Sequence, residues 1–295
     1  MHYQPDIGFH GSIKTEIEIN DLVKEPSLTL CDLQNFGYWG GAVSHKIFRE
    51  ITKISAFKRI ITRTHVDPEV SIRISTYTVW LDAGQVPSSR QDWHIDRVGT
   101  LHQIGVDEIV DLRDPFQFPS FMLVTAFIPE KKLDSDSLNQ TSTEFLLSTI
   151  SGSLPAFGID NSKMHQEIDE ALKLVDELDT VYSGNRMIVS FSPRTIHRPG
   201  KAIFPGWRYM LRIGLYTTKE KCSPYADHFI NFNPVWDSFS NSVKFRKVGR
   251  KETYATPNKR SIDLLKDMKN ANDLVRELGL FTGSTEGVNM IQKLI

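Results

Sequence analysis

Four segments rich in β-branched and aromatic residues most constrain the fold of this 295-residue chain. They are residues 71–82 (SIRISTYTVWLD), 121–128 (FMLVTAFI), 187–191 (MIVSF) and 207–217 (WRYMLRIGLYT). Turn-forming residues end the first two, since Ala83-Gly84 follows one and Pro129 the other. This composition, with turn-forming residues at the ends, is typical of strands. We therefore expect a β-sheet core in the middle of the chain.

Segments with helical periodicity lie outside these strands. Residues 41–54 place Val43, Ile47, Phe48, Ile51 and Ile54 on one face, and residues 162–178 and 261–278 show similar spacing. The resulting expectation is a mainly β fold with flanking helices (α+β), in which a sandwich or barrel is covered by helices.

Composition narrows the functional classes. The hydrophobic content of 40% allows a sizeable core, and the net charge of −1 gives no global attraction to nucleic acid or to an anionic membrane. Cys31 and Cys222 do not form a disulfide framework, and no secretory signal or run of about 18 apolar residues is visible. These features predict a soluble cytoplasmic protein, and they leave its oligomeric state open.

A histidine followed two positions later by a carboxylate occurs three times. The pairs are His65 with Asp67, His94 with Asp96, and His165 with Glu167. His165 and Glu167 fall in an expected helix, where residues two apart point about 200° apart, so we interpret them as part of a solvated face. His65 precedes Asp67-Pro68 and is typical of a turn.

His94 and Asp96 follow a strand, a glycine turn and a short loop. An extended backbone lets residues two apart face the same way, so both side chains could bind one ion. His197 follows the strand at residues 187–191 and could supply a third ligand. Two imidazoles and one carboxylate on one face of a metal leave positions open, as in non-haem Fe(II) oxygenases.

The layout resembles the Fe(II)/2-oxoglutarate-dependent oxygenases, in particular the phytanoyl-CoA hydroxylase-like branch. The string His197…Pro205-Gly206-Trp207-Arg208 is similar to the ending of that family, and Gly84 before His94 resembles its first turn. The similarity covers residues 71–216. It implies a double-stranded β-helix (jelly-roll or cupin-like) core at about 71–218 of a single catalytic domain, 1–295. An N-terminal helical and loop region, 1–70, and a C-terminal helical extension, 236–295, would flank this core.

The resemblance also assigns roles. His94, Asp96 and His197 would bind Fe(II) as the catalytic ligands, and Arg208 would hold the far carboxylate of the cosubstrate 2-oxoglutarate. Arg212 could take that role instead or anchor an anionic substrate. With O2, and with ascorbate as a reductant, the expected reaction is hydroxylation of a small metabolite or amino-acid-like substrate, with release of succinate and CO2. Desaturation stays an alternative outcome.

The sequence departs from the family at two positions. Met210 stands where many members have a serine that shares the carboxylate, and Pro199 stands where a small hydroxyl is common. A hydroxyl from a neighbouring strand would have to substitute. Thr76, Thr78 and Thr125 are the candidates, and the sequence does not choose among them.

A basic stretch at residues 244–260 suggests a different substrate. Its seven cations, with Phe245 and Tyr254 interleaved, could contact the phosphates and bases of nucleic acid. A solvated linker is the simpler interpretation for a chain of neutral charge. An oxygenase acting on nucleic acid or on a peptide or protein is therefore one alternative. Another is a non-catalytic cupin-like barrel that binds a ligand, whereas zinc hydrolysis lacks a supporting HExxH motif.

Overall fold

The computed structural model describes residues 5–25, 27–30, 41–66, 70–88, 91–95, 121–131, 135–150, 161–192, 195–217, 228–229 and 232–254. Its architecture is mainly β, and the strands of these ranges pair antiparallel. The mainly β class with flanking helices is thereby confirmed.

The largest sheet has seven strands in the order β1-β8-β5-β10-β3-β2-β11. Their bounds are β1 Ile7–Ser12, β8 Met187–Phe191, β5 Phe121–Pro129, β10 Gly206–Thr217, β3 Val70–Leu81, β2 Leu28–Leu30 and β11 His228–Phe229. The central strand β10 pairs along its whole length with β3, from Gly206 opposite Leu81 to Thr217 opposite Val70. Side chains alternate between two faces along such strands, so each face has its own core.

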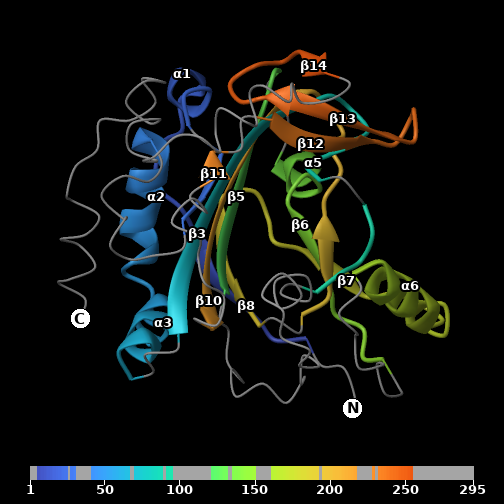
Figure 1. Cartoon of the computed structure of the whole chain (residues 1–295), viewed down its shortest axis with the longest axis horizontal. Helices are drawn as coiled ribbons and strands as arrows, with labels where there is room; N and C mark the ends of the chain where they lie inside the picture. Colours follow the sequence, from blue (N-terminus) through green and yellow to red (C-terminus); the bar gives the residue numbers. More distant parts are fainter. Residues whose placement is uncertain are drawn as a thin grey trace.

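Helices cover one face of this sheet. Helices α2 (Ala42–Ile51) and α3 (Ser55–Val66) lie along it, with the short α1 (Ile19–Leu22) beyond one end of α2 (Figure 1). Every second residue of β10, from Trp207 to Ile213, is buried in one cluster with Ile47 and Phe48 of α2. This apolar contact holds α2 against one face of the sheet, and the alternate residues of β10 point to the other face.

Smaller sheets lie on the opposite face (Figure 1). One is β7-β6-β9, made of Thr180–Tyr182, Thr143–Leu146 and His197–Pro199. The other is β14-β13-β12-β4, made of Thr253–Tyr254, Ser242–Lys247, Phe232–Asp237 and Gln85–Val86. Phe145 of β6 is buried in one cluster with Phe121 of β5, and Val235 of β12 is buried in another with Phe127. Helices α5 (Ser135–Asn139) and α6 (Asn161–Leu172) complete this layer.

The four strands expected from composition are confirmed as β3, β5, β8 and β10. The helix expected over residues 41–54 ends at Ile51, and the one expected over 162–178 ends at Leu172. Beyond Leu172 the apolar residues Leu174 and Leu178 are 83% and 41% exposed, so continuing the helix would bury nothing. The helix expected over residues 261–278 lies outside the described ranges.

Strands also form where helices or loops were expected. In the region 1–70, β1 and β2 join the main sheet. The helical extension expected from residue 236 is wrong as far as residue 254, because this part forms β13, β14 and the end of β12. In β13 the apolar Val243 and Phe245 alternate with basic residues, and this period of two is a strand pattern that the charges obscured. The jelly-roll topology and the single-domain division stay predictions.

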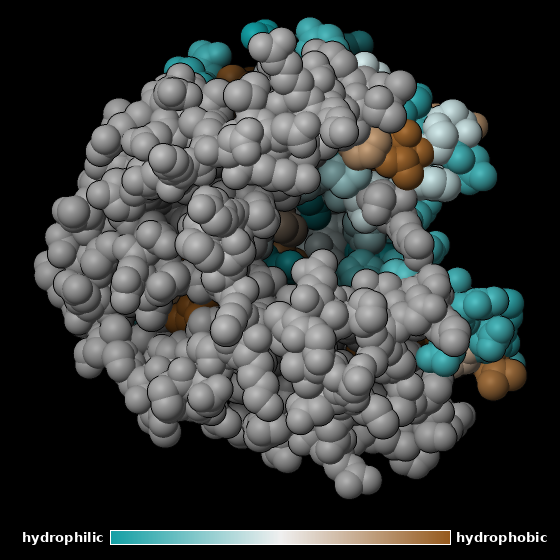
Figure 2. Space-filling model, viewed as in Figure 1, coloured by the Kyte–Doolittle hydropathy of each residue, from teal (hydrophilic) through white to brown (hydrophobic). Residues whose placement is uncertain are grey.

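The described part of the surface is mainly hydrophilic on the face that Figure 2 shows. Figure 2 shows that the described side chains visible on this face are mostly hydrophilic, with a few separate hydrophobic patches. None of the described helices has the length and apolar character to cross a bilayer.

Candidate metal centre

His94 and His197, distant in sequence, meet in the structure. Each donates its backbone N–H to the carbonyl of the other at 2.9 Å, which makes a small antiparallel bridge between their segments. Their ring centroids lie 4.5 Å apart with an interplanar angle of 57°. Because the bridge is made by the main chain, the two imidazoles are held together by the fold itself. The structure thus places these two residues side by side, and their role as metal ligands stays a prediction.

Both rings are oriented by main-chain carbonyls. The Nδ1 atom of His94 lies 3.1 Å from the Asp92 carbonyl oxygen, and Nδ1 of His197 lies 2.8 Å from the Thr195 carbonyl oxygen. A carbonyl only accepts, so each Nδ1 carries the proton, and the lone pair of the neutral ring is on Nε2. Metal-binding histidines use this arrangement, in which a hydrogen bond to one nitrogen prepares the other for the metal.

The surroundings of His197 are aromatic. The ring is buried, and its centroid lies 5.2 Å from that of Phe191 and 5.7 Å from that of Phe145. Phe191 in turn stacks on Phe121, with centroids 5.1 Å apart. An apolar wall of this kind limits the access of water to one side of the histidine pair, and it raises the strength of charge interactions there.

Asp96 lies outside the described residues, so its place beside the two histidines stays a prediction. Within the described ranges, no group of three or more His, Cys, Asp or Glu side chains is arranged to hold a metal ion. Of the other histidine–carboxylate pairs, His65 lies in α3 and not in a turn, and Asp67 is likewise outside the description.

Arg208 and Arg212 share the sheet face opposite α2 and α3. Their neighbours Trp207, Tyr209 and Leu211 point into the core beneath the helices, so the alternate residues of β10 point the other way. Arg212 places its guanidinium carbon 5.7 Å from the ring centroid of Phe121. Arg212 thus lies beside the aromatic wall that reaches His197. Arg208 lies roughly 13 Å further along the strand, from the rise per residue of an antiparallel strand.

Arg208 is buried without a carboxylate partner in the described part of the chain. It is 3% exposed, and its Nε donates to the Thr141 carbonyl at 3.1 Å. Burial lowers the pKa of Arg208 to about 10, and the nearby Tyr77 partly opposes this shift. The guanidinium is therefore protonated at neutral pH. A buried cation of this kind gains stability from an anionic ligand.

The register of the strands selects one of the three candidate hydroxyls. Thr76 and Thr78 lie opposite Leu211 and Tyr209, which belong to the helix-covered core. Thr125 lies opposite Met210 on β5, so it shares the face of the arginines and sits between them along the sheet. Its Oγ1 lies 3.4 Å from the Ser183 hydroxyl. Thr125 is the candidate that can reach a carboxylate beside Arg208 or Arg212.

His165 belongs to the surroundings of the histidine pair, so the expected solvated face was wrong for this residue. Its Nδ1 lies 2.9 Å from the Trp93 carbonyl, and its ring centroid lies 5.9 Å from that of His94. The missed signal was the spacing of His165, Ile168 and Leu172, which places the imidazole on the buried stripe of α6. Sequence reasoning considered only its pairing with Glu167.

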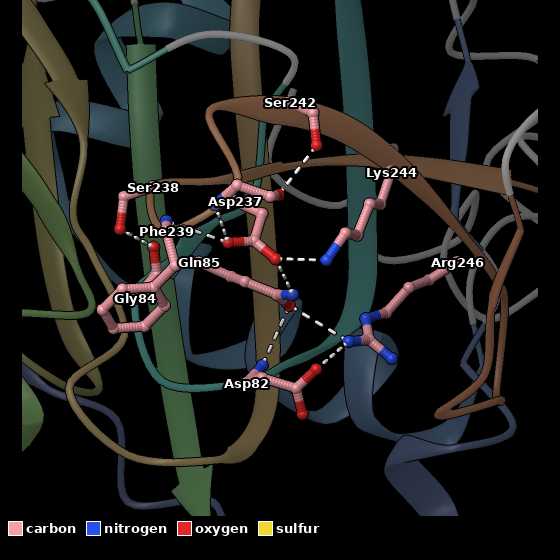
Figure 3. A network of polar contacts seen from close by, with 10 residues as sticks. Asp82, Gly84, Gln85, Asp237, Ser238, Phe239, Ser242, Lys244 and Arg246 are labelled. Carbon is pink, nitrogen blue, oxygen red and sulfur yellow. Dashed lines mark hydrogen bonds and ion pairs between the residues drawn. The ribbon is translucent and has the colours of Figure 1, made fainter.

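A polar network fastens the turn before His94 (Figure 3). Gly84 adopts φ +82°, a left-handed conformation that strains residues other than glycine. Its carbonyl accepts hydrogen bonds from the backbone and hydroxyl of Ser238. Its N–H donates to the carbonyl of Ala202, whose own N–H donates to Gln85. The loop after His197 and the turn before His94 are thereby joined.

The basic stretch is partly neutralised. In Figure 3, Lys244 pairs with Asp237 and Arg246 pairs with Asp82. Lys251 pairs with Glu130 at 2.9 Å, and its ammonium also lies 3.8 Å from the ring centroid of Trp80. Lys259 and Arg260 lie outside the described ranges. These ion pairs reduce the charge that the stretch can offer to phosphates.

Comparisons with known proteins give little further information. No family model and no curated protein matches the chain. It is weakly similar to the crystal structure of AviO1 from Streptomyces viridochromogenes Tue57, with 11% identity, a TM-score of 0.34, and coverage of 72% of this chain and 90% of that one. It is also weakly similar to the non-heme monooxygenase ThoJ in complex with nickel, with 7% identity, a TM-score of 0.25, and coverage of 80% and 72%. Similarity at this level supports no argument about activity.

Proposed function

We propose that this protein is an Fe(II)- and 2-oxoglutarate-dependent oxygenase with a jelly-roll core of the phytanoyl-CoA hydroxylase-like type. His94, Asp96 and His197 are the proposed iron ligands, and Arg208 is the proposed partner of the far carboxylate of 2-oxoglutarate. The observation that carries the proposal is the main-chain bridge that brings the imidazoles of His94 and His197 to 4.5 Å.

The described residues fit these groups chemically. Protonation at Nδ1 leaves a lone pair on Nε2 of both imidazoles, which is the form that binds a divalent metal. Arg208 offers a planar guanidinium in a buried site, where pairing with a carboxylate is strong. Thr125 lies on the same face and can replace the serine that the sequence lacks at Met210.

Bound iron with 2-oxoglutarate and O2 would supply the oxidation of a C–H bond, with succinate and CO2 as coproducts. The chain would supply orientation and exclusion of water. The bridge between the histidine segments fixes the ligands, the phenylalanine wall shields His197, and Arg208 orients the cosubstrate by its distal end.

The proposed substrate is a small metabolite or an amino-acid-like molecule, for which Arg212 offers an anchor on the same sheet face. The nucleic-acid alternative receives less support, because Lys244, Arg246 and Lys251 are already paired with carboxylates. The cupin-like binding protein is the alternative that turnover would exclude.

The test is succinate formation from 2-oxoglutarate with Fe(II) and ascorbate, across a panel of small acids and amino acids. Wild-type protein should form succinate with at least one of them, and Asp96→Ala should fall to background. Asp92→Ala is a matched control, because Asp92 is exposed and the main-chain carbonyl that accepts from His94 is kept in this variant. Equal turnover by Asp96→Ala and wild type would refute the ligand assignment. Binding of 2-oxoglutarate without any turnover would support the non-catalytic barrel instead.

A further inference from the structure

We propose that α6 positions the segment that carries His94, and that His165 is its positioning residue. This inference rests on the proposed function, because the position of His94 matters most if its imidazole binds a metal. It concerns a residue outside the iron ligands, on an element that contacts both ligand-bearing segments.

The polar contact is direct. Nδ1 of His165 lies 2.9 Å from the carbonyl oxygen of Trp93, the residue immediately before His94. A carbonyl only accepts, so Nδ1 of His165 donates the proton. The peptide group that receives this hydrogen bond is the one that leads into the α-carbon of His94, and its rotation would move the imidazole.

The contact completes a series. The carbonyl of Asp92 accepts from Nδ1 of His94, the carbonyl of Trp93 accepts from His165, and the carbonyl of His94 accepts from the backbone of His197. Three consecutive peptide carbonyls are thus held by three different donors. His165 supplies the one contact of the three that comes from neither proposed ligand, so it can be removed without changing the ligands.

Apolar packing connects α6 to the second ligand segment. Trp93 and Ile95 flank His94, and Ile196 precedes His197. All three belong to one buried cluster with Ile168 and Leu172 of α6. The helix therefore packs against side chains next to both histidines, and the imidazole of His165 adds a polar contact to the Trp93 carbonyl.

Two substitutions separate positioning from direct metal binding. His165→Asn keeps an N–H donor close to the place of Nδ1 and removes Nε2, whereas His165→Leu removes both. Gln166→Leu is the matched control, because Gln166 is the next residue on α6 and is exposed. Each protein, with wild type and His94→Ala, would be titrated with Co(II), whose visible spectrum reports the ligand geometry.

We expect His165→Leu to weaken Co(II) binding about tenfold and to change its spectrum, which is the order of effect of contacts outside the ligands. His165→Asn should recover most of the affinity, and Gln166→Leu should match wild type. Wild-type affinity in His165→Leu would overturn the proposal. Equal losses in the Asn and Leu variants would also overturn it, because the effect would then belong to Nε2.

Failure of the proposed function has a different result. If wild type and His94→Ala bind Co(II) equally, His94 is no ligand, and the positioning role is then tested by NMR of the histidine rings in metal-free protein. The Nδ1–H signal of His94 should persist in His165→Asn and Gln166→Leu and exchange faster in His165→Leu. An unchanged His94 signal in His165→Leu would overturn the positioning role.

Discussion

Two buried arginines, Arg208 on the main sheet and Arg246 in the β12–β13 hairpin, differ in what compensates their charge. They are 3% and 2% exposed. Arg246 pairs with Asp82 and donates to the side-chain oxygen of Gln85 at 3.1 Å. Arg208 donates to a main-chain carbonyl, and within the described chain no carboxylate pairs with it. The two arginines are equally buried, but only Arg246 has a carboxylate that balances its charge. Arg246 is therefore suited to stabilise the fold, and Arg208 is suited to bind an anionic ligand.

The physical reason is the cost of a buried charge. Removing a guanidinium from water is expensive unless an anion or several hydrogen bonds replace the water. Burial lowers the pKa of both arginines, and Asp82 opposes this shift at Arg246. At Arg208 an incoming carboxylate would provide the missing compensation. The comparison predicts a functional effect at one arginine and a stability effect at the other.

The largest expected effect follows Arg208→Met. The KM for 2-oxoglutarate should rise about 100-fold or more, because a buried charge-assisted pair is lost, while the KM for the substrate changes far less. The free energy of unfolding should stay the same or rise, because an uncompensated charge is removed. Steady-state kinetics and urea unfolding measure the two quantities. Arg212→Met is the matched control; if it produces the larger rise in KM, the two arginines have exchanged roles.

Arg246→Met should show the opposite pattern. Its loss leaves the oxygens of Asp82 and Gln85 without their cation, and we expect the free energy of unfolding to fall by about 2 kcal/mol. The KM for 2-oxoglutarate should not change. Arg250→Met is the control, because Arg250 is exposed in the turn between β13 and β14. A KM effect of Arg246→Met comparable to that of Arg208→Met would break the comparison.

The same hairpin should make stability depend on acid pH. The hydrogen bond from Lys244, helped by the N–H groups of Ser240 and Phe239, lowers the pKa of Asp237 to about 2. Because the folded pKa lies below the unfolded one, the carboxylate stabilises the fold fully above about pH 4, and this contribution is lost as the pH falls toward 2. The free energy of unfolding, measured with urea between pH 2 and 6, should depend less steeply on pH in Asp237→Asn than in wild type. The same pH dependence in wild type and Asp237→Asn would contradict the lowered pKa of Asp237.

Lys251→Met should have the smallest effect. Its ion pair with Glu130 is half exposed on both sides, and its contact with Trp80 adds a cation–π interaction. Such surface contacts contribute less than about 1 kcal/mol. Thermal unfolding at low and high salt measures the loss, with Glu130→Gln as a partner variant. A loss as large as that of Arg246→Met would show that exposure does not separate these cations.

Local sequence patterns predicted the long strands but not their neighbours. Strands β5 and β8 consist almost entirely of apolar, β-branched and aromatic residues, so composition was sufficient to predict them. Strand β9 has only three residues, and β13 alternates apolar with basic residues. Their pairing depends on tertiary contacts, which short patterns do not contain.

The same distinction applies to the site. The proximity of His94 and His197 could be predicted, because each residue follows shortly after an expected strand of the core. The contact of His165 with the Trp93 carbonyl was not, since it joins a helix to a loop distant in sequence. The choice of Thr125 over Thr76 and Thr78 required the strand register.

The central claim is that His94 and His197 bind one metal ion, and anaerobic reconstitution with Fe(II) tests it most directly. Wild type, His94→Gln and His197→Gln would be loaded, desalted and analysed for iron. The account predicts about one iron per chain in wild type and little or none in both variants, with their folds intact by circular dichroism. Wild-type iron content in either variant would contradict it.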